Sequence, residues 1–94
     1  MNYFADMKPL PTEGEVMAEL EDYLIEVDRP ITPSEAYKEL ASRFRLTLEQ
    51  RTRLMPNGKD VHWENRIRFA RRKLMDAGRL DPDQPRGYWR IRSK

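Results

Sequence analysis

The sequence predicts an α+β fold that is mainly helical: a winged helix-turn-helix with three to four helices followed by a two-stranded β-wing. Three observations predict it. Three short segments each begin with a threonine-based capping box, a longer segment over residues 61–77 has an apolar stripe at helical spacing, and residues 79–92 have a hairpin pattern. We expect residues 12–92 to form one domain and residues 1–11 to be a flexible N-terminal arm, with Tyr3 and Phe4 as its candidates for docking.

The first helix is predicted to begin after Thr12. Glu15 follows three residues later, so each side chain can accept a hydrogen bond from the other residue's free backbone N–H. Pro30 cannot continue a helix, so we expect the helix to end by about Asp28. The apolar positions recur at helical spacing: Val16, Met17, Leu20, Tyr23, Leu24 and Val27. The remaining surface of this helix is acidic.

The second and third helices carry the same start signal. Thr32 and Glu35 form the second box, with a proline at the first helical position, and this helix is expected to run to about Phe44. Thr47 and Gln50 form the third box, which opens a short helix over residues 48–54.

A turn connects the short helix to the longest one. Residues 55–58 read Met-Pro-Asn-Gly, in which proline favours the second turn position and Asn-Gly tolerates positive φ. Asp60 is the expected cap of the next helix.

The longest predicted helix, residues 61–77, has an apolar and a basic side. Its apolar stripe recurs at intervals of four, three, four and three residues: Trp63, Ile67, Ala70, Leu74 and Ala77. Asn65, Arg68 and Arg72 fall roughly opposite that stripe, with Arg71 beside them. Gly78 stands where a glycine ends a helix.

Residues 79–92 are predicted to form the β-wing. A tip rich in proline, aspartate and glycine separates a short strand at residues 79–81 from an alternating strand at residues 88–92. Trp89 and Ile91 point to one side of the second strand, and Tyr88, Arg90 and Arg92 to the other. Since an isolated hairpin is marginal in water, we expect Trp89 and Ile91 to pack on the helices.

Charge is divided unevenly along the chain. Residues 1–50 contain five Lys/Arg and eleven Asp/Glu, whereas residues 51–94 contain thirteen and five. A surface with one acidic and one basic side favours a polyanionic partner on the basic side. The alternative is that the charges only keep a small domain soluble.

The candidate DNA-binding residues fall into two groups. Asn65, Arg68 and Arg72 match side chains that pair with adenine and guanine in the major groove, or they belong to a solvated helix face. The rest are candidates for backbone contact at the helix and the wing: Lys59, His62, Arg66, Arg71, Arg86 and Arg90. Arg66 flanks the apolar stripe, so a structural ion pair is a comparable alternative. Trp63 is expected in the core.

The composition gives little support for other functional classes. The chain has no cysteine and one histidine, so neither a thiolate nor a multi-histidine metal site is possible. It has no glycine-rich phosphate loop, and Asp81-Pro82-Asp83 fits a turn. We expect no catalytic residue, no metal and no cofactor, and no membrane span or signal segment, which favours a cytoplasmic protein.

Several short motifs occur together in the second half of the chain: Leu54-Met55-Pro56-Asn57-Gly58, Asn65-Arg66-Ile67, Phe69-Ala70, Leu74, Ala77-Gly78 and Arg86-Gly87-Tyr88-Trp89-Arg90-Ile91. This set resembles the N-terminal domain of Mrr-type restriction proteins. The resemblance implies a winged helix that binds DNA, usually ahead of a separate nuclease domain that restricts methylated DNA. No nuclease domain is expected within residues 12–92.

Three residues depart from the pattern expected for that family. Arg68 stands where a small residue is common, Phe69 replaces a tryptophan, and Arg79 interrupts an apolar run. We expect Phe69 to keep the packing role of the tryptophan, and the arginines to alter any shared DNA preference rather than the fold.

Two functions follow as hypotheses. The first is a DNA-binding module, the target-recognition part of a methylation-dependent restriction system, with double-stranded DNA and a nuclease domain or subunit as partners. The alternative is a protein–protein interaction module that uses the acidic first helix.

Overall fold

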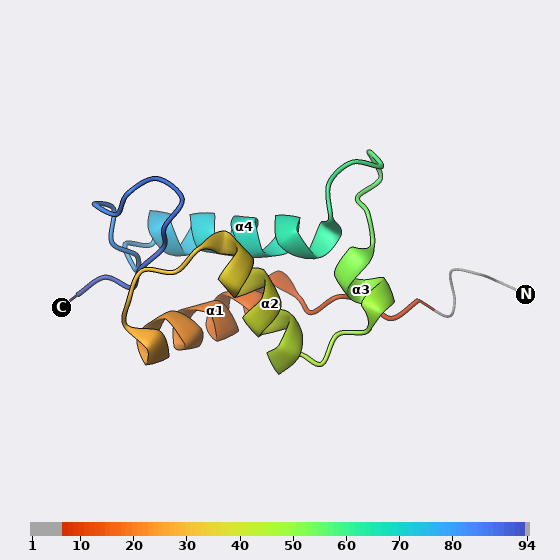
Figure 1. The fold of residues 1–94 in the computed structure, drawn as a ribbon, viewed down its shortest axis with the longest axis horizontal. Coiled ribbons are helices and arrows are strands. Elements are labelled where there is room, and N and C mark those ends of the chain that lie inside the picture. The colour runs from red at the N-terminus through yellow and green to blue at the C-terminus, as the bar shows by residue number, and fades with distance from the viewer. Residues whose placement is uncertain (1–6, 94) are drawn as a thin grey trace, which may run out of the picture.

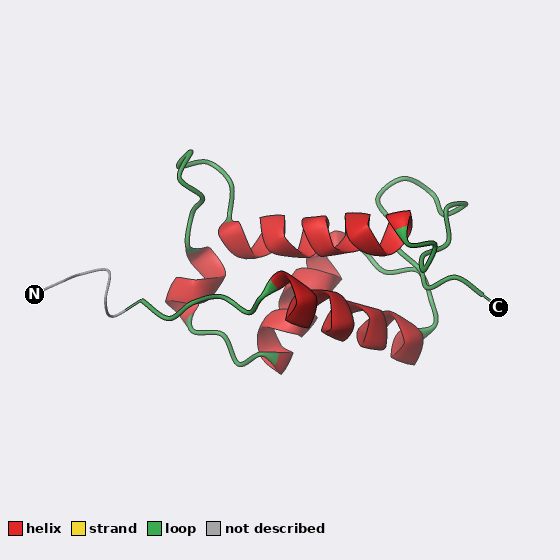
Figure 2. Cartoon of the chain, turned by 180° about the vertical axis from the view of Figure 1, so that it is seen from behind, coloured by secondary structure: helices red, strands yellow, loops and turns green. Residues whose placement is uncertain are grey.

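Four helices make up most of the molecule (Figure 1). The computed structural model describes residues 7–93. Its elements are α1 (Glu13–Val27), α2 (Pro33–Arg43), α3 (Leu48–Thr52) and α4 (His62–Asp76). Figure 2 shows that loops join them and that the part of the chain described has no continuous strand. The prediction of a mainly helical fold is confirmed.

The first three helices begin as predicted. The Thr12, Thr32 and Thr47 side chains each accept a hydrogen bond from the backbone N–H three residues later, at 3.2, 3.3 and 3.2 Å. In each box the N3 side chain accepts from the threonine N–H in return. Both bonds of a box lie within four consecutive residues, which explains why the pattern is visible in the sequence.

The start of α4 differs from the prediction. Val61 occupies the N-cap position, and no side chain caps the helix. The predicted cap, Asp60, is wrong because it lies one residue too early and its carboxylate accepts from Asn57 Nδ2 at 2.8 Å. Instead, the first helical N–H, that of His62, donates to the Arg53 carbonyl at 2.8 Å.

Gly78 ends α4 as predicted. Its φ of 74° is in the left-handed region, where a side chain would be strained. Gly78 N–H donates to the Met75 carbonyl at 3.0 Å, and Arg79 N–H donates to the Leu74 carbonyl at 2.9 Å. These two bonds satisfy carbonyls that the helix end leaves without partners. Ala77 is exposed, so the buried stripe of α4 ends at Leu74 rather than at Ala77.

The core lies mainly between α1 and α4, which run side by side (Figure 1), with α2 packed against both. Helix α1 contributes Val16, Leu20, Tyr23 and Leu24, and α4 contributes Trp63, Ile67, Ala70 and Leu74. The Trp63 indole N–H donates to the Tyr37 carbonyl at 3.0 Å. Trp63 is therefore a core residue, as predicted, with its one polar atom satisfied.

The 79–92 loop packs on the helices but does not contain two continuous strands. Leu80 and Ile91 form one antiparallel bridge within it. Trp89 forms another with Ile31, and the two residues exchange N–H···O bonds of 2.8 Å. Residues 82–87 form the tip, and its two prolines have no N–H to donate to a ladder. Trp89 is buried and Ile91 is half-buried against the core, so their predicted packing is confirmed.

Residues 7–11 lie against the body of the domain. Leu10 is buried, and three side chains donate to carbonyls of this segment. Gln50 donates to Pro9 at 3.0 Å, Arg53 to Lys8 at 2.5 Å, and Arg66 to Pro11 at 2.6 Å. The rest of the predicted arm, including Tyr3 and Phe4, lies outside the described residues.

Candidate nucleic-acid interface

The side of α4 opposite its buried stripe is the predicted base-reading face. Arg68 and Arg72 are exposed there, and Asn65 is half-buried. Arg68 Nη1 lies 3.9 Å from Glu64 Oε1 and donates to the Tyr37 hydroxyl at 3.4 Å. Arg72 makes no ion pair or side-chain hydrogen bond within residues 7–93. We call this surface, defined by Asn65, Arg68 and Arg72, the outer face of α4.

Phe69 also lies on the solvent side of α4, with 44% of its surface exposed. The expected packing role is therefore wrong. At about 100° per residue, position 69 is far from the buried stripe and about 40° from Asn65 around the helix axis. The same spacing that placed Asn65 on the outer face could have placed Phe69 there. The resemblance predicted a packed aromatic residue at this position, whereas the helical spacing indicated an exposed one.

Arg71 connects α4 to the 79–92 loop. Its guanidinium carbon lies 5.9 Å from the centre of the Trp89 ring, within range of a cation–π interaction. Its Nε atom is buried and has no hydrogen-bond partner among residues 7–93. Arg71 is thus beside the outer face, as predicted, and the ring of Trp89 restricts its orientation. Sequence spacing alone could not reveal this contact.

Arg66 and His62 lie on the opposite flank of α4, near its start. Arg66 Nη2 lies 3.3 Å from His62 Nε2, and Nη1 donates to the Pro11 carbonyl. Burial, followed by the positive charges of Arg66 and Arg53, lowers the pKa of His62. A neutral imidazole can accept the Arg66 hydrogen bond. Arg66 therefore ties the N-terminal segment to α4. Within the described residues it makes this backbone contact and not the ion pair that was the alternative to a DNA contact.

Lys59 lies in the turn that precedes α4. This turn forms as predicted: Gly58 N–H donates to the Met55 carbonyl at 2.8 Å, and Gly58 has a φ of 71°. The Asn57 side-chain oxygen accepts from Lys59 N–H at 2.9 Å. Lys59 is exposed, and its amine makes no ion pair with the residues described. The turn thus holds a cation beside the first residue of α4.

Arg86 and Arg90 have different surroundings in the 79–92 loop. Arg86 is exposed at the tip, next to Gly87, and has no ion pair within residues 7–93. Arg90 is half-buried, donates to the Asp28 carbonyl at 3.3 Å, and lies 3.7 Å from the Asp28 carboxylate. Arg90 therefore holds the loop to the end of α1, whereas the guanidinium of Arg86 is available to solvent.

The acidic residues of α1 are largely paired within the chain. Arg43 contacts both Glu26 and Glu19, the latter at 3.2 Å, and the hydrogen bond to Glu26 is the main cause that raises the Arg43 pKa. Glu21 pairs with Arg79. In addition, Glu13 pairs with Lys73 at 3.5 Å. These contacts partly neutralise the acidic helix, while several cations around α4 have no carboxylate partner among the described residues.

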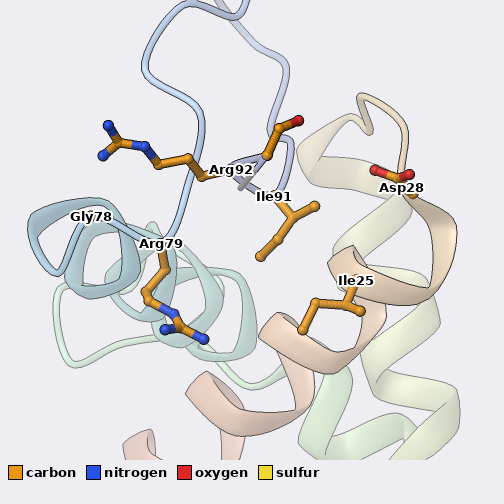
Figure 3. A pocket seen from close by; sticks show the side chains of 7 residues that line it. Ile25, Asp28, Gly78, Arg79, Ile91 and Arg92 are labelled. Carbon is orange, nitrogen blue, oxygen red and sulfur yellow. The ribbon is translucent and has the colours of Figure 1, made fainter.

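A groove lies away from these residues. It has a volume of about 760 Å³ and is lined by residues from the ends of α1 and α4 and from the last residues described: Ile25, Asp28, Gly78, Arg79, Ile91, Arg92 and Ser93. Figure 3 shows the Ile25 and Ile91 side chains near each other, with the Arg92 side chain pointing away from both. None of the predicted site residues lines it, so the candidate interface is separate from this groove.

The described residues contain neither a candidate metal site nor a candidate membrane span. Within residues 7–93, no three His, Asp or Glu side chains come together in a way that could hold a metal ion. No described helix is long and apolar enough to cross a membrane.

Comparison with known proteins gave one match. A family model described as the Mrr N-terminal domain matches residues 14–94. No curated protein and no solved structure matches the chain.

Proposed function

The chain belongs to the Mrr N-terminal domain family, and from this premise we propose that it is a winged-helix module that binds duplex DNA. In this proposal, α4 enters the major groove and the 79–92 loop serves as the wing. The module is the target-recognition part of a restriction system, and its recognition of DNA depends on methylation. A nuclease domain or subunit, rather than these residues, cuts the DNA.

The distribution of unpaired cations carries the proposal. Arg72 in the second half of α4, Lys59 in the turn before it and Arg86 in the loop beyond its end have no carboxylate partner within residues 7–93. The turn and the loop stand at opposite ends of α4 (Figure 1). A row of cations along a helix and beyond both of its ends suits the phosphates on either side of a groove.

The dimensions of α4 support the same arrangement. Its 15 residues span about 22 Å, and the major groove, about 12 Å wide, admits one helix. Asn65, Arg68 and Arg72 would then face base edges, where amide and guanidinium groups recognise adenine and guanine. Lys59 and Arg86 would contact phosphates, and Arg71 would contact the backbone beside the wing.

Arg66, His62 and Arg90 have supporting roles in this proposal. Arg66 holds the N-terminal segment, His62 accompanies Arg66 on the same flank of α4, and Arg90 holds the end of α1. Their charges add to the field that attracts DNA.

The main alternative is a protein partner that binds the acidic helix α1. Its glutamates pair largely with arginines and a lysine of the same chain, so a basic partner would have to compete with existing ion pairs. Asp22 is exposed and has no such pair within the described chain. The distribution of charge therefore favours DNA.

Titration with duplex DNA at low salt tests the proposal. Arg72→Glu should weaken binding strongly, because it places a negative charge on the surface that faces the phosphates and bases. Arg45→Glu is the matched control, since exposed Arg45 follows α2 and the substitution changes the net charge equally. Equal affinities for the two variants would reject the outer face of α4 as the binding surface, and no binding by the unaltered chain would reject DNA as the ligand.

A further inference from the structure

Phe69 is an aromatic side chain on the basic side of α4. It lies within about 40° of Asn65 around the helix axis, and Arg72 and Lys73 follow at three and four residues, the spacing of helix neighbours. Phe69 is 44% exposed and does not belong to the buried core or to the residues packed against it. The packing of this domain therefore gives no reason for a large apolar residue at this position.

One side of the ring is covered by Lys73. The Lys73 amine lies 5.0 Å from the ring centre and also pairs with Glu13. Since Glu13 belongs to α1, this contact lies on the side of the ring toward α1. Helical spacing places Asn65 and Arg72 on the other side of Phe69. A large apolar group beside a hydrogen-bonding amide and a cation is suited to a ligand that has both polar and apolar features.

The major groove offers such a ligand. Its base edges are made of hydrogen-bond donors and acceptors, and the apolar group among them is the methyl at C5 of thymine. A 5-methylcytosine presents the same methyl at the same position. We propose that Phe69 contacts the C5 methyl group of a pyrimidine and is a specificity-determining residue of the outer face of α4. This inference rests on the proposed function, because it places α4 in the major groove.

The charges around Phe69 favour DNA over an apolar protein surface as the partner. Burying Arg72 against an apolar protein would remove its charge from water without a partner, which is costly. Against DNA, Arg72 meets phosphates or guanine while the ring meets a methyl group, so both side chains are accommodated in one groove.

The experiment removes the methyl group and the ring in turn. Preferred duplexes are first selected from a random pool. Each thymine in the selected site is then replaced by deoxyuridine, and each cytosine by 5-methylcytosine, one position at a time. Burying one methyl group contributes about a four-fold change in affinity. The unaltered chain should lose about this factor at a thymine position, or gain it at a cytosine position, and the arm that responds identifies the source of the methyl group.

Two variants decide the role of Phe69. Phe69→Ala should abolish the methyl-dependent difference while the thermal melt stays near that of the unaltered chain, because the ring is outside the core. Ile25→Ala is the control: Ile25 is 52% exposed on α1, and this variant should keep the difference.

Three results would overturn the inference. They are a selection that enriches no sequence, an unaltered chain indifferent to the C5 methyl at every pyrimidine, and an unchanged methyl response in Phe69→Ala. Salt-dependent binding to duplex DNA in any of these cases would leave the proposed DNA binding standing, although a selection that enriches no sequence would also remove its target-recognition role. Absence of DNA binding would reject both.

Discussion

Trp89 joins three parts of the molecule that are far apart in the sequence. Its backbone pairs with Ile31, which precedes α2, and its ring lies below the Arg71 guanidinium of α4. The side chain is 7% exposed, whereas the adjacent Tyr88 is 47% exposed. This one residue therefore fixes the position of the 79–92 loop relative to the helices.

Trp89→Ala should lower the free energy of unfolding by about 3–5 kcal/mol, because it removes a buried indole and leaves a cavity. That is a large part of the roughly 5–15 kcal/mol of a typical domain. Thermal or urea unfolding measures the change. Tyr88→Ala is the control and should cost much less. Equal losses for the two variants would show that the loop does not pack through Trp89.

His62 gives the stability a dependence on pH. Burial and two neighbouring arginines lower the pKa of the folded imidazole below its ordinary value. As pH falls through about 6.5, the unfolded chain binds a proton that the folded chain does not yet bind. Stability should therefore decrease toward lower pH, with the His62 contribution lost between the unfolded and the folded pKa.

His62→Gln tests this expectation. Glutamine keeps an acceptor near Arg66 but does not titrate, so the variant should lose less stability between about pH 7.5 and 5.5 than the unaltered chain. Urea unfolding at several pH values in this window measures the difference. Glu15, Glu49 and Asp81 have lowered pKa values, so their contributions are lost at more acid pH. Parallel curves for the two proteins would contradict the assigned role of His62.

At the scale of elements, α4 and its two flanking segments are proposed to make different kinds of contact with DNA. The outer face of α4 presents Arg68 and Arg72, whereas Lys59 and Arg86 lie in the turn before the helix and in the loop after it. A helix in the major groove presents its outer face to base edges, and the segments at its ends lie close to the phosphates.

Arg72→Ala and Arg86→Ala should therefore have different effects. Loss of Arg72 should cost roughly 1–3 kcal/mol on a preferred site and flatten the preference between sequences. Loss of Arg86 should weaken binding to all sequences alike and reduce the salt slope by about one. Titrations on selected and scrambled duplexes separate the two outcomes. Identical behaviour of the two variants would refute this division.

At the scale of the whole molecule, the acidic and basic halves of the sequence are joined by ion pairs. Arg79 and Lys73 of the basic half pair with Glu21 and Glu13 of α1. The net positive charge that remains accessible is therefore smaller than the sequence of the second half suggests.

Salt dependence measures this accessible charge. If four to six phosphates are neutralised, an order-of-magnitude count, the logarithm of the binding constant should fall with the logarithm of salt with a slope of about −4 to −5. DNA titrations between about 50 and 200 mM salt give the slope. Arg45→Gln is the control and should leave it unchanged. A slope near zero would mean that phosphates are not the main contacts.

The sequence by itself determined the features that depend on neighbouring residues. Each of the three capping boxes is complete within four residues, and the end of α4 at Gly78 depends on a few positions before it. The apolar stripe of α4 also repeats within the helix, so the sequence alone predicts that Trp63 and Ile67 are core residues. Such interactions are fixed by backbone geometry at three- and four-residue spacing.

Only the tertiary structure decided which long-range partners these residues have. It placed Arg66 against Pro11, Arg71 against Trp89, and Ile31 beside the 79–92 loop. In the tertiary structure the predicted strands are present only as isolated bridges. A strand needs a hydrogen-bonding partner along its length, and the prolines of the tip have no N–H to donate. These contacts join segments from 18 to 58 residues apart, and the path that brings them together is set by the packing of the whole core and not by local spacing.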